Sequence, residues 1–414
     1  MNAPSQFKTS FNNPFIPLRH PSFRYYWIGM WISLIGTWMQ SVAQPWLAYS
    51  ITHSAFLLGL VGALQYLPML ILSLFAGVVV DRLPTKKLIY FTQAASLVIV
   101  LLMALLVYSG RIQFWHILVL ATSLGLVNTL DMPARQAFVI QLVGKADLMN
   151  AIALNSVAFN SARIIGPAIA GVLIGVYGVG ICFLLNGLSF AAVLVSLIFI
   201  RPLPYRGDTT GHKHILTDIK AGLTYVYQHR SVLEAIILMA IIGTFAMNNN
   251  VLVPVFNQEV LGQGALGFGF LLSFSGVGSL IGALLIAAMS SLGPQKWAVY
   301  FVPFLIGVFL ILNSFTRSFW LTGFYLAASG LCFNLFSSTV NSTIQLHTPD
   351  QFRGRVMSLY TLVFIGSTPV GNLFAGWSDE YWGAQYGFAA CGAMVIVFLL
   401  PVYIYRLAKR LKGS

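Results

Sequence analysis

The sequence predicts an all-α membrane protein with twelve transmembrane helices arranged in two six-helix halves. Hydrophobic residues make up 58% of the 414-residue chain and charged residues only 8%, whereas about a quarter of the residues in an ordinary soluble domain are charged. The second half also echoes the first about 205 residues later, because Gly77 and Gly125 have counterparts in Gly282 and Gly330. A doubled set of six helices is typical of secondary transporters, which place a site between the halves.

Each apolar stretch reaches or approaches the ~20 residues that a helix needs to cross the hydrocarbon core. Helices are expected because lipid offers no hydrogen-bond partner to open backbone. We assign 1–200 to an N-terminal bundle, 201–230 to a cytoplasmic linker and 231–414 to a C-terminal bundle. The predicted spans are 25–51, 55–80, 88–108, 114–135, 148–177, 179–200, 232–258, 265–291, 297–314, 319–345, 355–377 and 383–405.

The linker between the halves contains a second helical pattern. Ile215, Ile219, Leu223 and Val226 recur at helical spacing between polar residues. This pattern predicts a short amphipathic helix that lies on the inner membrane surface.

The net charge of +13 is distributed unevenly. If the N-terminus is cytoplasmic, the inner segments hold 20 of the 23 Lys and Arg, and the outer loops hold only Arg111 and Arg317. The positive-inside rule therefore predicts a multi-pass protein of the cell's inner membrane with both termini in the cytoplasm. The same asymmetry indicates membrane lipids as partners and argues against nucleic acid.

Polar residues within spans show which helix faces avoid lipid, because burying them in hydrocarbon is costly. They form one-sided stripes on spans one, five, seven and ten, while spans nine and twelve have almost none. The stripes indicate either a water-filled cavity or hydrogen bonds between helices, and we favour the cavity for spans one and ten. The candidate substrate-cavity residues are Thr37, Gln40, Gln44, Asn160, Arg163, Asn248, Asn334 and Asn341.

Arg163 is the unusual member of this set, because it lies near the centre of span five. An arginine at that depth costs at least ~2.5 kcal/mol unless water, an acid or an anion compensates. No acid occurs at a similar depth in another span. We therefore favour a cavity-facing arginine over one that is bonded to helix carbonyls.

The loop after span two reads Gly77-Val-Val-Val-Asp81-Arg82-Leu-Pro84-Thr85-Lys86-Lys87. It resembles the signature loop of the major facilitator superfamily, in which a glycine precedes Asp-Arg and a basic cluster. Other passages resemble the branch that contains the enterobactin exporter and drug-efflux proteins. These passages are Gly36 to Gln40, Pro45 to Leu47, Asp131 to Phe138, Asn155 to Asn160, Ala162 to Pro167 and Arg353 to Ser358.

The resemblance implies a secondary active transporter that works by alternating access. The favoured function is the export of amphiphilic or drug-like small molecules. The alternative is a facilitator or a lysophospholipid-type lipid transporter. The coupling species would be a proton or another ion. Span one carries Gln40 and Gln44 where many proton-coupled relatives carry a carboxylate.

The resemblance also implies a cytoplasmic gate. Asp81 would lie beside the start of span eleven, where a helix N-terminus favours an anion, with Arg82, Lys86 or Lys87 as the basic partner. Asp131 and Arg135 are spaced i, i+4 as an ion pair prefers. They form either a simple interfacial pair or a part of the gate network.

Other classes of protein lack support in the sequence. There is no Gly-x-Ser-x-Gly or Cys-x-x-Cys motif and no carboxylate pair at catalytic spacing, so an enzyme is not expected. A phosphate-binding G-x-x-x-x-G-K-[ST] loop is also missing. We expect no cofactor and no metal site, and a monomer as the functional unit.

The charge asymmetry generates a topology prediction. Reporter fusions at the C-terminus and within the 201–230 linker are both expected to score cytoplasmic, because these segments carry the inner-side cations. A periplasmic signal from either fusion would contradict the assignment.

Overall fold

The structure, a computed structural model, describes residues 15–200, 215–289 and 293–412. Eleven helical segments in this part are long and apolar enough to cross a membrane. Helix α1 (Pro21–Thr52), which is 32 residues long and carries the polar stripe of span one, adds the twelfth span. The prediction of a twelve-helix, all-α membrane fold is therefore confirmed.

The helices follow the predicted spans closely. After a 3-10 turn, η1 (Ile16–Arg19), and α1 come α2 (Ala55–Arg82), α3 (Thr85–Tyr108), α4 (Phe114–Val143), α5 (Leu148–Tyr177), α6 (Gly180–Ile198), α7 (Ile215–Gln228), α8 (Arg230–Phe245), α9 (Asn249–Glu259), α10 (Ala265–Ala288), α11 (Lys296–Phe315), α12 (Phe319–Leu346), α13 (Asp350–Trp382) and α14 (Ala384–Lys412). Span seven is the exception, because it is divided into α8 and α9.

A serine marks the beginning of one helix, and glycines follow the ends of three others. The side chain of Ser54 caps α2 by accepting a hydrogen bond from the Leu57 amide at 3.2 Å. Gly144, Gly178 and Gly383 follow α4, α5 and α13 with φ of 72°, 78° and 90°. Glycine adopts this backbone region without a Cβ penalty, so the chain can turn directly into the next span.

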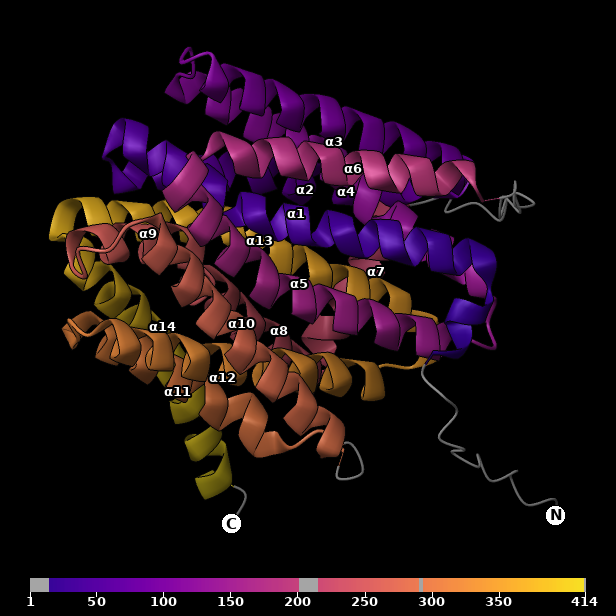
Figure 1. Ribbon diagram of the computed structural model, residues 1–414. Helices are drawn as coiled ribbons and strands as arrows, with labels where there is room; N and C mark the ends of the chain where they lie inside the picture. Colours follow the sequence, from indigo (N-terminus) through magenta and orange to yellow (C-terminus); the bar gives the residue numbers. More distant parts are fainter. Residues whose placement is uncertain (1–14, 201–214, 290–292, 413–414) are drawn as a thin grey trace.

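The halves meet through two pairs of helices. Helices α2 and α13 pack together, as do α5 and α10, and in Figure 1 these pairs lie between the purple first half and the orange second half. We call the side on which α1 begins and α6 ends the inner side, and the opposite side the outer side. Each pair thus joins one helix from each half.

The glycines show where along their length these helices touch. A Cβ at Gly376 would lie 2.5 Å from the Ala55 carbonyl oxygen, and one at Gly171 would lie 3.0 Å from the Ala265 carbonyl oxygen. These close backbone contacts lie in the outer parts of the helices. Gly77 and Gly354, near the inner ends of α2 and α13, have nothing within 4 Å of a Cβ position. The halves are therefore closed against each other on the outer side and separate toward the inner side.

A pair of small residues also holds the second half together. A Cβ at Gly278 would meet the Ala327 backbone, and one at Gly282 would meet that of Leu331, so both glycines of this pair allow α10 and α12 to pack closely. Of the pair on α5, only Gly171 has such a contact, because Gly175 has open space around it.

Proline residues interrupt three of the four helices that join the halves. Pro68 lies inside α2, Pro167 inside α5 and Pro369 inside α13. Each proline removes one backbone donor from its helix. At Pro167 the carbonyl left without its intrahelical partner is that of Arg163.

Helix α7 occupies the linker where an amphipathic helix was predicted, and it is attached to the second half. Gly222 packs against Arg355 and Leu359 of α13, and the Tyr225 hydroxyl donates to the His347 carbonyl at 2.8 Å.

The contact between α5 and α10 generates a prediction. Gly171→Val is expected to force these helices apart on the outer side, whereas the matched control Gly175→Val on the same helix has room for its side chain. An Ala55→Cys reporter, buried at the start of α2, should react with an impermeant maleimide several-fold faster in the Gly171 variant than in the control. Equal labelling rates would contradict this description of the outer closure.

Candidate substrate cavity and gates

Arg163 lies on α5 at the level where the two halves begin to separate. The backbones of α5 and α10 still approach each other closely here, because a Cβ at Gly276 of α10 would lie 3.0 Å from the Arg163 carbonyl oxygen. The guanidinium carbon lies 5.6 Å from the ring centroid of Trp38 on α1, an arrangement in which the aromatic face attracts the cation. Within the described residues, Arg163 makes no ion pair and its side chain donates no hydrogen bond. Its planar donors are therefore free for an anion or water.

Tryptophans of α1 lie along the sides of α5 and α10 in this region. Trp38 packs edge-on against Phe159 with ring centroids 5.5 Å apart, and the Trp31 indole donates to Ser161 at 3.0 Å. Trp46 stacks on Phe268 of the second half at 6.3 Å. These tryptophans thus face α5 and α10.

The amides of α1 form a network between helices. Asn186 of α6 donates to Gln40 at 2.5 Å, Gln40 donates to Gln44 at 3.1 Å, and Gln44 donates to Gln65 of α2 at 2.8 Å. Gln40 and Gln44 are both buried. Interhelical hydrogen bonding therefore accounts for these two amides, while Thr37 on the same helix is exposed and donates to its own helix at the Ser33 carbonyl.

Asn160 and Asn248, the remaining candidates outside α12, have different surroundings. Asn160 is half-buried, and its amide donates to the Ser156 carbonyl at 2.8 Å. Asn248 precedes α9 at the break in span seven, is fully buried, and donates to the Thr244 carbonyl at 2.8 Å. The structure therefore places Asn248 inside the second half, behind the surface that a substrate could reach.

The wall formed by the second half contains a polar hollow of about 330 Å³. Asn341 lines it, and Asn334 lies beside it, with 3.4 Å between its side-chain oxygen and the hydroxyl of the lining residue Ser338. Its aromatic lining, which includes Tyr360 and Phe364, was not predicted because aromatic residues in a span carry no signal of which way they face. The lining residues are Met239, Phe333, Ser337, Ser338, Asn341, Ser342, Tyr360 and Phe364.

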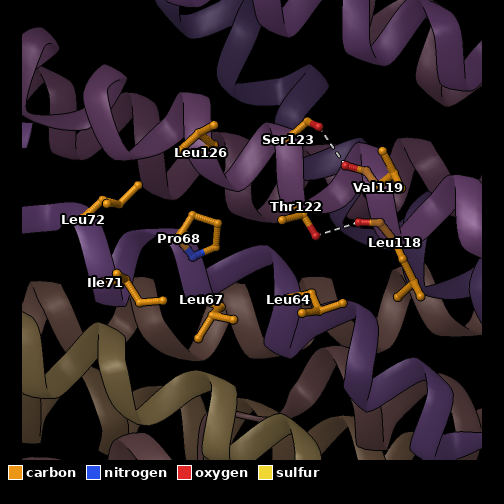
Figure 2. A pocket seen from close by; sticks show the side chains of 10 residues that line it. All are labelled: Leu64, Leu67, Pro68, Ile71, Leu72, Leu118, Val119, Thr122, Ser123 and Leu126. Carbon is orange, nitrogen blue, oxygen red and sulfur yellow. Dashed lines mark hydrogen bonds between the residues drawn. The ribbon is translucent and has the colours of Figure 1, made fainter.

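An apolar hollow of about 540 Å³ lies between α2 and α4. Figure 2 shows its ten lining side chains, with Leu64, Leu67 and Pro68 on one wall. Its two hydroxyls, on Thr122 and Ser123, donate to carbonyls of their own helix at 2.7 and 2.8 Å. The hollow therefore presents no free polar group and suits a hydrocarbon chain.

Asp131 forms a buried ion pair at the inner part of the first half. Its carboxylate contacts the Arg135 guanidinium and also accepts hydrogen bonds from Thr92 at 2.6 Å and Gln93 at 2.9 Å. Helix α4 continues through Pro133, so the i, i+4 spacing holds the pair together. All of these partners belong to α3 and α4.

The other predicted gate residues lie apart from this pair. Lys86 donates to the Ile200 carbonyl at the end of α6 at 2.7 Å, and Arg82 is exposed at the end of α2. The backbone of Asp81 belongs to α2, but its side chain lies outside the part of the chain that the structure describes.

Two hydrogen-bonded contacts close the outer side, and the sequence analysis did not identify them. The Tyr49 hydroxyl of α1 donates to the Glu259 carboxylate at the end of α9. Glu380 of α13 accepts hydrogen bonds from the Ser54 hydroxyl at 3.0 Å and the Phe56 amide at 3.2 Å, both at the start of α2. Each contact joins the first half to the second, so we call them together the outer gate.

The chain is similar to membrane transporters over nearly its whole length. The sequence pattern of the family described as "Transmembrane secretion effector" matches residues 12–412. The staphyloferrin A transporter of Staphylococcus aureus is 25% identical over 94% of this chain and 97% of the relative. The multidrug efflux pump Tap of Mycolicibacterium fortuitum is 26% identical over 90% and 93%, and the enterobactin exporter of Escherichia coli is 26% identical over 94% and 93%.

Solved structures show the same fold. A bacterial homologue of the human lysosomal transporter Spinster, in an inward-facing and unoccupied conformation, aligns with a TM-score of 0.75 over 95% of this chain and 98% of that chain, at 12% identity. A bacterial homologue of the iron transporter ferroportin, in an inward-facing state, aligns with a TM-score of 0.69 at 14% identity, over 92% and 98% of the two chains.

The environment of Asp131 generates a stability prediction. Asp131→Ala removes one partner of a buried pair and is expected to destabilise the first half by about 3–5 kcal/mol. Asp350→Ala is the control, because its pair with Arg353 is exposed and worth about 0–1 kcal/mol. Melting temperatures of the purified variants measure the difference, and equal values would indicate that Asp131 is not a stabilising residue.

Proposed function

Because the chain belongs to the transmembrane secretion effector family of the major facilitator superfamily, we propose that it is a secondary active exporter of amphiphilic small molecules. The relatives named as a staphyloferrin A transporter, an enterobactin exporter and a multidrug efflux pump support export of siderophore-like or drug-like compounds. The closed outer side and the separated inner ends correspond to the inward-facing state of an alternating-access cycle.

The observation that carries the proposal is the unpaired guanidinium of Arg163 beside an aromatic surface. A cation that has no acid partner within the membrane attracts an anionic group, and Trp38 and Phe159 offer contact area to an apolar body. The hollow lined by Asn341 and Tyr360 supplies hydroxyl, amide and aromatic groups from the second half. A molecule with an anionic or zwitterionic head and an aromatic or aliphatic body fits both surfaces.

A lipid-like substrate is the second candidate, and one observation favours it. The apolar hollow between α2 and α4 has the lining expected for an acyl chain. A lysophospholipid-type transporter would use such a surface for the tail while Arg163 attracted the phosphate.

The proposal includes the setting in which the protein works. We place it in the inner membrane with both termini in the cytoplasm, as a monomer, because the two halves of one chain form both the cavity and the outer gate. Its family indicates a transporter and not an enzyme.

Variants of Arg163 test the substrate class. Arg163→Gln removes the charge at similar length, whereas Arg163→Lys keeps the charge and loses the planar fork. Gln is expected to lower export of anionic amphiphiles at least tenfold, and Lys by less. A toxicity screen in a pump-deficient host would first identify a substrate, and uptake into inside-out vesicles would then measure the rates.

Size-exclusion profiles of both purified variants provide the control for folding. If both variants transport normally, or if both fail to fold, Arg163 has a structural role and the anionic-substrate proposal fails.

A further inference from the structure

Asp379 is a buried carboxyl group in the second half. It lies near the outer end of α13 and is 4% exposed. Both of its carboxylate oxygens lack a hydrogen-bond partner in the described part of the chain. One carboxylate oxygen of Asp379 occupies the space that a Cβ at Gly387 of α14 would fill. The side chain of Leu252 of α9 packs against the same position. The outer ends of these three helices lie together at the left of Figure 1.

Among the described residues, the charged groups that act on Asp379 are acidic. The carboxylates that act on it belong to Glu259 of α9 and Glu380 of its own helix. Tyr49 of α1 and Cys391 of α14 are the other titratable side chains within its range. An ionised carboxylate that is buried without a cation or a hydrogen-bond donor is strongly disfavoured. Asp379 is therefore neutral in this conformation and holds a proton.

The position of Asp379 links this proton to the outer gate. Its neighbour Glu380 binds the start of α2, and Glu259 binds Tyr49 of α1. When the halves separate on the outer side, both contacts break and water enters between α2, α9 and α13. The solvated carboxyl then ionises at neutral pH, because its ordinary pKa is about 3.9.

Further polar groups continue from Asp379 toward the membrane centre. Cys391 lies one helical turn beyond Gly387 on α14, and its sulfur is 3.9 Å from the Asn248 amide nitrogen. The Asn248 side-chain oxygen is also buried and has no partner among the described residues. These groups connect the site of Asp379 with the break between α8 and α9.

We propose that Asp379 is a proton-binding carboxyl of the outer gate, and that the gate closes only over its neutral form. Closure takes up one proton from the external water, and opening releases one. Given the exporter proposed above, external protons favour the step from the outward-facing to the inward-facing state, and the proton returns to the external water when the outer gate opens again.

The test measures the opening of the outer gate without any substrate. Spin labels at Ile51→Cys and Tyr386→Cys, both exposed outer positions, report the distance between the halves by double electron–electron resonance. The native cysteines are buried and serve as a silent background. In the full-length protein, the ratio of open to closed molecules is expected to rise with pH, by up to ~10-fold per pH unit for one linked proton.

Variants assign the linked proton to Asp379. Asp379→Asn and Asp379→Leu cannot ionise and are expected to remain closed, with a ratio that changes less than about twofold between pH 5 and 9. Asp350→Asn, a matched change at an exposed position of the same helix, keeps the wild-type response. Replacing Na⁺ with choline at constant pH leaves the ratio unchanged.

Three results would overturn the proposal: a wild-type ratio that does not change with pH, a pH response that persists in the Asp379 variants, or a ratio set by Na⁺. A wild-type ratio that does not change with pH overturns the proposal even if the variants do not fold. Because no substrate is present, a failure of the exporter proposal in vesicles leaves this result unaffected, and the converse also holds.

Discussion

The structure depends on the need to give each polar group inside the membrane a partner or access to water, because hydrocarbon supplies neither. Three solutions occur at different places in the described structure. The amides of Gln40 and Gln44 are paired within a network that crosses from α6 to α2. Arg163 lies over the aromatic face of Trp38. Asp379 has no hydrogen-bond donor among the described residues, and its burial favours the neutral acid. The hydrogen-bonded network holds its helices together, whereas Arg163 and Asp379 each leave an ionisable group available to bind a substrate or a proton.

The sequence alone predicted the architecture almost completely, for a physical reason. Hydropathy is a local property, so each span could be located from its own residues. The orientation that the charges between spans predict stays a prediction. Helix ends were less certain where helices extend beyond the membrane, as α13 does by beginning at Asp350. The break at Asn248 was missed, because the three asparagines from 248 to 250 were interpreted as a stripe.

The sites were only partly predictable, because their partners are distant in the chain. Spacing placed Gln40 on one face of a helix, but its partner Asn186 lies 146 residues away. The outer gate joins Tyr49 to Glu259 across 210 residues. Arg163 could be found because a lone charge at mid-span is conspicuous in the sequence itself. Asp379 was overlooked because it lies at the end of a span, where an acid usually contacts water.

The prolines of α2, α5 and α13 have a consequence for how the molecule changes shape. A helix that has lost one of its internal hydrogen bonds bends more easily at that point. Pro68, Pro167 and Pro369 lie close to the level at which the contacts between the halves end, next to Leu70, Arg163 and Gly366. These three helices can thus bend at one common level near the middle of the membrane. Such bending opens either end of the space between the halves, while the outer and inner helix segments keep their own packing.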